Sequence, residues 1–253
     1  MAIQSGGSLR IVPSRIIHSH PVSAVVSVAF AGFVVVFMVF AGLGLLIKNQ
    51  LGVVSRWDID VIQWLADHRT SGTNEWTRFA TGVADTLGIL VVLVVAIVVL
   101  ILMRRRWAAF FLGLALALEL MSFLAANYVV NRPRPDVVRL GTLPSTSSFP
   151  SGHTAAIVAL YGGLALIFSD RFRSWVIRIV VWLAVLLTTL AIGFGRVYRG
   201  MHFPSDAVAG ALLGLAVLGV AFVAVRAGQL ARVERNGVPS EKPGRSFFLE
   251  VVQ

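Results

Sequence analysis

The sequence predicts an all-α integral membrane protein, a bundle of six transmembrane helices with an interfacial helical segment between the first and the second. Two observations support this prediction. The 253-residue chain is 57% hydrophobic and only 13% charged, a composition that ordinary soluble domains do not have. Its apolar residues also gather in runs that approach or exceed the roughly 20 residues needed to cross a bilayer core of about 30 Å.

Six apolar runs define the predicted spans. They are Pro21–Ile47, Gly82–Met103, Trp107–Val130, Thr154–Ser169, Trp175–Phe194 and Ala207–Val225. The fourth run is short, but Pro150 and Ser151 before it supply a helix start that lengthens it. The first run is longer than the core of a cleaved signal peptide, about 7 to 15 residues, and no small-residue cleavage site follows it, so we interpret it as a retained helix.

The segment between the first two spans, Leu51–Thr81, is too polar to cross a bilayer. Its apolar side chains recur at helical spacing and form one face: Trp57, Val61, Trp64 and Leu65. Asp58, Asp60 and Asp67 are predicted on the opposite face. This pattern, with tryptophans at membrane-interface depth, predicts a short helix that lies flat at the outer interface.

Basic residues set the predicted orientation. The net charge is +10, but the arginines are spread over the connecting segments rather than along one stripe, which argues against nucleic acid as a partner. With the N-terminus inside, thirteen of the 22 basic residues fall on cytoplasmic segments. Both termini are therefore predicted to be cytoplasmic, in a plasma membrane of bacterial type.

The chain divides into three predicted regions. Residues 1–20 form a cytoplasmic N-terminal segment, residues 21–226 the membrane domain, and residues 227–253 a mobile cytoplasmic tail rich in Gly, Pro, Ser and charge. The chain has no cysteine, which excludes disulfides and thiolate metal sites. Gly210 and Gly214 in the last span have a small-xxx-small spacing that favours close helix packing.

Side chains capable of catalysis concentrate at two outward-facing segments and one helix start. After the third span, prolines fix Arg132 and Arg134 where a guanidinium can hold a phosphate with two parallel hydrogen bonds. At the start of the fourth span, Gly152 lets an anion approach free backbone N–H groups, and Ser151 adds a hydroxyl donor. His153 follows directly, where it can donate a proton near neutral pH.

The segment between the fifth and sixth spans adds Arg196, His202 and Asp206. His202 and Asp206 are four residues apart around a predicted helix start, close enough for the carboxylate to orient the imidazole and stabilise its positive charge. Each of these patterns is common by chance. Their occurrence together on one face of a small bundle indicates a phosphate-handling site.

This combination resembles the type 2 phosphatidic acid phosphatases, membrane lipid phosphate phosphatases that share a site with vanadium haloperoxidases and bacterial acid phosphatases. The resemblance covers residues 21–226 and rests on three motifs. These are Lys-x6-Arg-Pro, matched by Arg134 and Pro135; Pro-Ser-Gly-His, matched by Pro150–His153; and Ser-Arg-x5-His-x3-Asp, matched by Arg196, His202 and Asp206.

The resemblance implies hydrolysis of a membrane lipid phosphate at the outer face, without a metal ion or cofactor. His202 would attack phosphorus, Asp206 would orient it, and His153 would protonate the leaving oxygen and then activate water. The phosphate-binding residues implied by the motifs are Arg134, Arg196, Ser151, Gly152 and Asn127.

Two positions depart from the family pattern. Asn127 stands where the first motif has lysine, and Gly195 where the third has serine. Asparagine can donate a hydrogen bond to phosphate but adds no charge. We therefore expect either compensation from Arg132, Arg139 or Arg199, or an activity that is narrowed or reduced. If the missing charge limits phosphate binding, Asn127→Lys should lower the Michaelis constant.

The motifs grip only a phosphate, so prenyl pyrophosphate, phosphatidylglycerol phosphate and phosphatidic acid all fit as substrates. A phosphotransferase with a lipid or sugar hydroxyl as acceptor is an alternative. A catalytically silent lipid-binding or transport protein is a second one. Glu119, inside the third span, is interpreted as a polar contact between helices because a carboxylate there is costly unless it is protonated, paired or near water.

Overall fold

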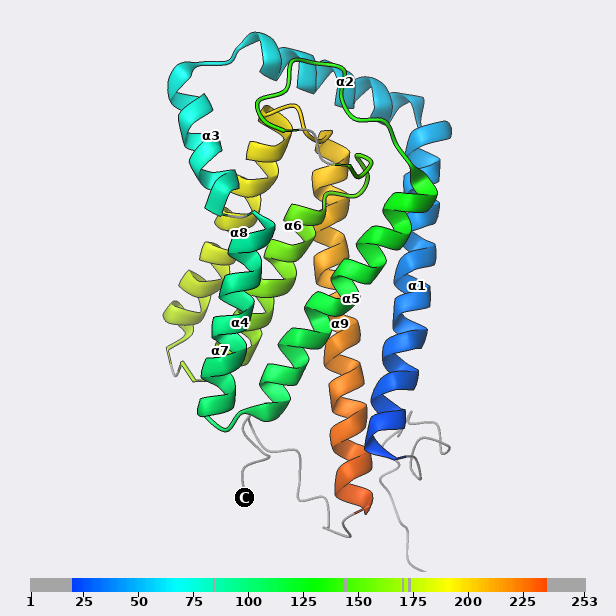
Figure 1. Ribbon diagram of the computed structural model, residues 1–253, viewed down its shortest axis with the longest axis vertical. Helices are drawn as coiled ribbons and strands as arrows, with labels where there is room; N and C mark the ends of the chain where they lie inside the picture. The colour runs from blue at the N-terminus through cyan, green and yellow to red at the C-terminus, as the bar shows by residue number, and fades with distance from the viewer. Residues whose placement is uncertain (1–19, 84, 143–144, 170, 173, 236–253) are drawn as a thin grey trace, which may run out of the picture.

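The computed structural model describes residues 20–83, 85–142, 145–169, 171–172 and 174–235, and within these residues the regular structure is entirely helical, as predicted (Figure 1). In chain order the elements are α1 (Pro21–Asn49), α2 (Gly52–Asp67), α3 (Ser71–Val83), α4 (Thr86–Leu102), α5 (Arg106–Val130), α6 (Gly152–Ile157), the π-helix η1 (Val158–Gly162), α7 (Gly163–Ser169), α8 (Trp175–Tyr198) and α9 (Pro204–Arg235).

The predicted spans are confirmed as helices. Within the described residues, five helical stretches are long and apolar enough to cross a membrane: α1, α5, the run α6–η1–α7, α8 and α9. The pair α3 and α4, bent by 43°, meets the same criterion when the two helices are taken together as one span, which gives a sixth. The last helix is longer than predicted, because α9 continues through residues 227–235, which the sequence assigned to the tail. The remaining tail, 236–253, lies outside the described residues.

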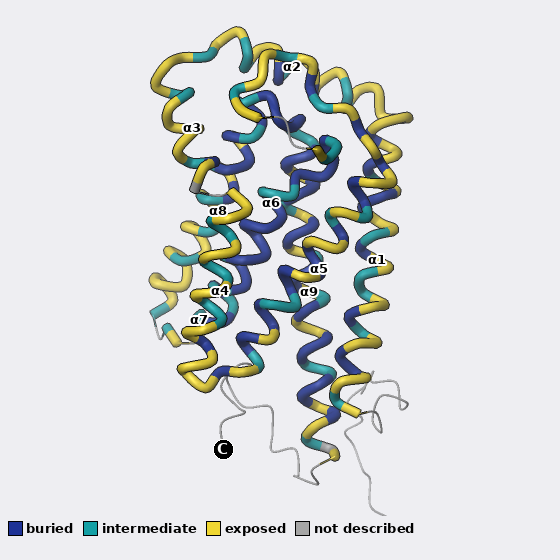
Figure 2. The backbone as a smooth tube through the Cα atoms, viewed as in Figure 1, coloured by how far each residue is buried: buried dark blue, intermediate teal, exposed yellow. Residues whose placement is uncertain are grey.

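Helix α9 occupies the middle of the bundle and packs along α1, α5 and α6. Buried residues follow this central column, whereas α1, α4 and α8 expose apolar side chains outward (Figure 2). A Cβ added at Gly210 would lie 2.3 Å from the Ser151 carbonyl oxygen, and one at Gly214 would lie 2.6 Å from that of Ala155. The predicted close packing at these glycines is confirmed, and it fixes the start of α6 against α9.

Helix α2 lies across one end of the bundle, here called the α2 end (Figure 1). The helix is present where the sequence predicts it, but its assignment of faces is wrong at one residue. Asp58 is fully buried, whereas Trp57 and Trp64 are exposed. The reason is an ion pair with Arg132, a partner far along the chain that compensates the carboxylate for leaving solvent.

The described parts of the loop between α5 and α6, residues 131–142 and 145–151, also lie at the α2 end (Figure 1). The anchor of this loop is Phe149, which is fully buried. A Cβ at Gly44 of α1 would lie 2.6 Å from the Phe149 ring, so the ring fills the space that this glycine leaves. The anchor holds residues 147–151 in place for the site below.

Candidate active site

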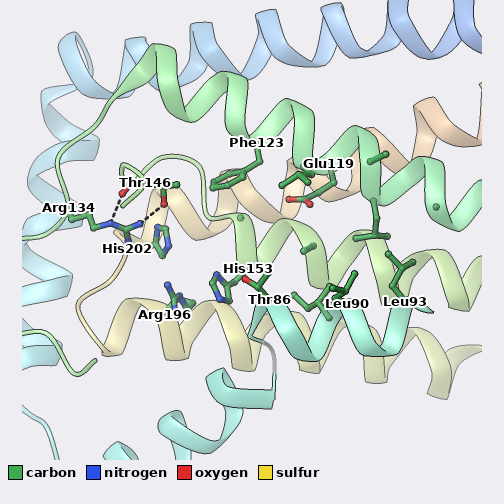
Figure 3. Close-up of a pocket in the computed structure, with 17 residues that line it drawn as sticks. Thr86, Leu90, Leu93, Glu119, Phe123, Arg134, Thr146, His153, Arg196 and His202 are labelled. Carbon is green, nitrogen blue, oxygen red and sulfur yellow. Dashed lines mark hydrogen bonds between the residues drawn. The ribbon is translucent and has the colours of Figure 1, made fainter. Parts of the chain in front are cut away.

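Four side chains from separate elements meet at the α2 end around one cavity of about 540 Å³. Arg134 comes from the loop after α5, His153 from the start of α6, Arg196 from the last turn of α8, and His202 from the turn between α8 and α9. Figure 3 shows their side chains gathered at one end of the cavity. The structure therefore brings together predicted site residues from all three motifs.

The rest of the cavity wall is apolar. It runs from the polar end between α4 and α5, where leucines and other apolar residues line it: Ile89, Leu90, Leu93, Leu116, Leu120 and Phe123. The exceptions along this wall are Glu119 and, at the start of α4, Thr86. A cavity with a cationic, histidine-bearing end and an apolar remainder suits a ligand that joins an anionic group to a hydrocarbon chain.

The ring of His202 is fixed by a hydrogen bond from Nδ1 to the Ser148 carbonyl oxygen, at 2.7 Å. A carbonyl oxygen can only accept, so Nδ1 carries the proton. In a neutral imidazole the other nitrogen, Nε2, then has a free lone pair. The contact therefore selects the tautomer with an unprotonated Nε2 in a ring that lines the cavity.

Burial lowers the pKa of His202 well below its ordinary value, and the positive charges of Arg196 and Arg134 lower it further. The hydrogen bond to the Ser148 carbonyl acts in the opposite direction without reversing the shift. At neutral pH the imidazole is consequently uncharged. Its geometry and its electrostatics both favour a nucleophile or base.

Asp206 lies in the first turn of α9 and organises this region indirectly. It accepts hydrogen bonds from the Ser148 hydroxyl, from the Phe203 backbone N–H at 2.9 Å, and from Arg132 at 2.6 Å. Its distance to Nδ1 of His202 is 3.9 Å, too long for a hydrogen bond. The sequence predicts a direct contact between Asp206 and His202. In the structure Ser148 connects them instead: its hydroxyl bonds to Asp206, and its carbonyl oxygen orients the His202 ring.

Arg132 lies behind this relay and outside the cavity. Its guanidinium bridges Asp206 and Asp58, at 2.6 and 2.7 Å. It also packs over the Phe203 ring, 4.3 Å from the centroid. Two carboxylates share one planar guanidinium in a buried network, which joins α2 to the start of α9.

Arg134 lines the cavity but is largely engaged with the protein. Four of the five N–H donors of its guanidinium group bond to oxygens of Thr146, Ser147 and Met201. Burial lowers its pKa, Asp206 opposes this effect, and Arg139 adds to it. An arginine remains charged under these conditions. Arg134 therefore offers the cavity its positive charge and one further N–H, rather than the two parallel hydrogen bonds to phosphate that the sequence predicts.

Arg196 is less engaged with the described residues than Arg134. Its side chain lines the cavity, and its Nε is buried without a hydrogen-bond partner among the described residues. A buried donor without a partner is costly, by about 1 to 3 kcal/mol. This guanidinium is therefore suited to bind an anion that enters the cavity.

At the start of α6, the predicted residues separate into two groups. Gly152 and His153 line the cavity, and Nε2 of His153 lies 3.6 Å from Asp85 Oδ1. A Cβ at Gly152 would lie 3.0 Å from the Phe123 ring, so the glycine allows this ring to approach the start of α6 closely. Ser151 is fully buried, and its hydroxyl contacts that of Thr154 at 3.0 Å; the structure does not bring it to the cavity.

Asn127 is also directed away from the cavity. Its amide donates to the carbonyl oxygens of Ser147 and Phe149 and accepts from the Ser147 N–H, each at 3.0 Å. It serves as a clamp on the loop before α6. Nor do Arg132, Arg139 and Arg199 line the cavity, so the expected compensation for a missing lysine is not provided by them.

Sequence reasoning missed three polar residues at the site: Asp58, Asp85 and Ser148. Asp85 precedes α4, where an acidic residue ordinarily indicates a helix cap. Ser148 lies in a polar run directly before the Pro-Ser-Gly-His motif, which could have indicated a role. No group of three or more His, Cys, Asp or Glu side chains placed to hold a metal ion occurs in the part of the chain that the structure describes.

Comparison with known proteins identifies the relatives of this chain. A model of the PAP2 superfamily matches residues 106–229. The bacitracin transport permease protein BcrC of Bacillus licheniformis is 32% identical over 133 residues, 49% of this chain and 60% of that protein. The lipid A 1-phosphatase of Rhizobium etli is 38% identical over 96 residues, 38% of this chain and 37% of that protein. The chain thus matches less than two thirds of either relative.

The fold is shared with a solved structure. The crystal structure of a transmembrane PAP2 type phosphatidylglycerolphosphate phosphatase from Bacillus subtilis has a TM-score of 0.63 at 20% identity, and covers 88% of this chain and 98% of that one. The matched residues 106–229 run from the start of α5 into α9. They include all cavity residues of α5, α6 and α8, and those of the loops between α5 and α6 and between α8 and α9. Over residues 106–229 the chain therefore matches the PAP2 superfamily, and the family resemblance predicted from its motifs is confirmed.

Proposed function

We propose that this protein is an integral membrane phosphatase that hydrolyses a lipid phosphate or pyrophosphate through a phosphohistidine at His202. The observation that carries the proposal is the state of this ring, with Nδ1 bonded to the Ser148 carbonyl and Nε2 unprotonated. The ring lies near Arg196, whose buried Nε has no hydrogen-bond partner among the described residues. The relatives named for lipid A and phosphatidylglycerol phosphate support a substrate with a phosphate next to an apolar chain.

The proposed reaction has two displacements. In the first, the Nε2 lone pair of His202 attacks phosphorus, and the bond from phosphorus to the leaving oxygen breaks as His153 donates a proton to that oxygen. In the second, the now neutral His153 takes a proton from water, the water oxygen attacks phosphorus, and the phosphorus–nitrogen bond breaks. Inorganic phosphate leaves, and both imidazoles return to their starting states.

The remaining residues hold this arrangement. Asp206 accepts a hydrogen bond from the Ser148 hydroxyl. The Ser148 carbonyl oxygen stabilises the positive charge that develops on His202 when Nε2 bonds to phosphorus. Arg134 and Arg196 would neutralise the phosphoryl oxygens, with the backbone at Gly152 close by. Fixed guanidinium charge in a partly dry cavity can perform the task that Mg²⁺ performs in many phosphoryl-transfer enzymes, so we propose a metal-independent reaction.

We also propose that the α2 end faces outward in a plasma membrane and that both termini are cytoplasmic. The support is the charge at the opposite end of the bundle, where α4, α5, α7, α8 and α9 begin or finish (Figure 1). Basic residues cluster there: Arg104, Arg105, Arg106, Arg171, Arg178, Arg226, Arg232 and Arg235. Such a cluster favours the cytoplasmic side.

The test is phosphate release by the detergent-purified protein in EDTA, against prenyl pyrophosphates, phosphatidylglycerol phosphate and phosphatidic acid. We expect release from at least one lipid, and its loss in His202→Ala. His68→Ala is the matched control, because His68 is an exposed histidine stacked on Trp64 of α2. Full hydrolysis by His202→Ala would overturn the mechanism, and dependence on added metal would overturn its metal-independent form.

Two alternatives give different results in the same assay. A phosphotransferase would release the group onto an added lipid or sugar hydroxyl rather than onto water, which product analysis with a candidate acceptor detects. A catalytically silent lipid-binding or transport protein is favoured by the name of the permease relative. Such a protein would bind lipid phosphates without releasing phosphate from any of them.

A further inference from the structure

Glu119 is a buried acidic group that the proposed reaction does not use. It lies on α5, is 4% exposed and lines the cavity. Its Oε1 is buried and has no hydrogen-bond partner among the described residues. Figure 3 shows Glu119 and Phe123 on the same side of α5, facing the cavity.

The side chains that line the cavity beside Glu119 leave its buried oxygen without a hydrogen bond. The neighbouring wall of the cavity is made by Leu90, Leu93, Leu116 and Leu120, which offer neither donors nor acceptors. Leaving a buried carboxyl oxygen without a hydrogen bond is unfavourable whether or not the group is ionised. A partner must therefore come from whatever occupies the cavity.

The position of Glu119 indicates which part of a bound lipid it meets. Phe123 is one helical turn, about 6 Å, from Glu119 along α5, and the Phe123 ring lies against Gly152, next to His153. A substrate with its phosphate among Arg196, His153 and His202 would thus pass Glu119 within a few bonds of the phosphoester. Beyond it, only hydrocarbon meets the leucine wall.

We propose that Glu119 is a specificity-determining residue that recognises a hydroxyl group on the carbons just beyond the phosphoester. A hydroxyl both donates and accepts, so it satisfies the carboxyl group in either protonation state. The inference rests on the proposed function and narrows its substrate class to hydroxylated lipid monophosphates. A prenyl pyrophosphate fits less well, because it would place a second anionic phosphate toward this carboxyl group.

The test uses lipid pairs that differ in one hydroxyl. Lysophosphatidic acid is compared with its 2-deoxy analogue of the same chain, and ceramide 1-phosphate with its 3-deoxy analogue, at equal mole fraction in detergent micelles. We expect the wild-type protein to prefer the hydroxylated member of at least one pair by about tenfold in kcat/KM, the effect of one hydrogen bond. The pair with the larger ratio identifies a glycerol or a sphingoid backbone.

Variants distinguish recognition of the hydroxyl group by Glu119 from an effect of cavity shape. Glu119→Met should remove the preference while turnover of the deoxy lipids persists, and Glu119→Gln should keep most of it. Leu120→Met, a change in the same wall without a polar group, should leave the ratio unchanged. Equal kcat/KM for both members of both pairs in the wild-type protein would overturn this inference, whereas hydrolysis that survives in His202→Ala would instead overturn the proposed function.

Discussion

His202 illustrates how surroundings give one residue its chemistry. Burial and the charges of Arg196 and Arg134 lower its pKa, so its unprotonated form persists into acidic solution. We therefore predict that kcat/KM, corrected for the second ionisation of the phosphate ester near pH 6, is retained as pH falls through about 6.5, the ordinary histidine value. Activity should be lost only below that pH, and an acidic limb at or above it would contradict the assignment.

Asn127 has a structural role that the motif comparison did not suggest. Its amide bonds to Ser147 and Phe149 on either side of Ser148, the residue that holds His202. A lysine can donate but cannot accept from the Ser147 N–H. We now predict that Asn127→Lys fails to lower KM, reduces kcat, and destabilises the fold by about 2 kcal/mol.

The matched control for this substitution is Tyr128→Lys, since Tyr128 is the neighbouring residue and is 87% exposed. It adds the same charge without touching the loop, so kcat and the thermal midpoint should stay near those of the wild type. A lower KM in Asn127→Lys with unchanged stability would instead mean that Asn127 stands in place of a phosphate-binding cation.

Residue types and spacing predicted which segments carry the site, and they could not predict the contacts inside it. Arg134, Arg196, His153 and His202 line one cavity because their motifs lie at helix ends on one side of the bundle. The partner of Asp206 depends instead on the path of the loop 131–151 over α9. Hydrogen bonds between residues distant in sequence, such as that from Ser148 to Asp206, leave no periodic trace in the sequence.

At the scale of elements, α2 is attached to the bundle through Asp58. Besides Arg132, Asp58 accepts from the Ser205 backbone N–H at 2.9 Å and from the Ser205 hydroxyl, at the start of α9. Ile62 adds a small apolar contact with Val197 and Phe203. The attachment therefore depends on a buried ion pair, and removing one partner leaves Arg132 with less compensation.

We predict that Asp58→Ala destabilises the protein by about 3 kcal/mol and lowers kcat, because Arg132 also bonds Asp206. Thermal unfolding in detergent and steady-state kinetics measure the two effects. Asp60→Ala, an exposed acidic residue on the same helix, should change neither. An Asp58→Ala protein with the wild-type midpoint would mean that α2 is held by its apolar contacts alone.

Helices themselves were the most predictable elements, since a span requires an apolar run of fixed length. The run Trp107–Val130 matches α5 to within one residue. The faces of α2 were less predictable. Asp58 was expected to face solvent, because its partner Arg132 lies in another segment of the chain and could not be foreseen. The end of α9 was also predicted too early, because its last turns are polar and were therefore assigned to the C-terminal tail.

At the scale of the whole molecule, the bundle has two chemically different ends. The α2 end holds the cavity residues and the buried network of Asp58, Arg132 and Asp206. The opposite end gathers arginines at the turns between helices. Since positive charge is retained on the cytoplasmic side during insertion, these arginines support the proposed orientation, in which the reaction takes place at the outer surface.

The orientation can be tested cleanly because the chain has no cysteine. We predict that Gln63→Cys, at an exposed position of α2, reacts with a membrane-impermeant maleimide in intact bacterial cells. Arg232→Cys, at an exposed position near the end of α9, should react only after permeabilisation. The reverse pattern would place the cavity inside the cell, where a lipid phosphate of the inner leaflet would be the substrate, and labelling of both in intact cells would mean dual orientation.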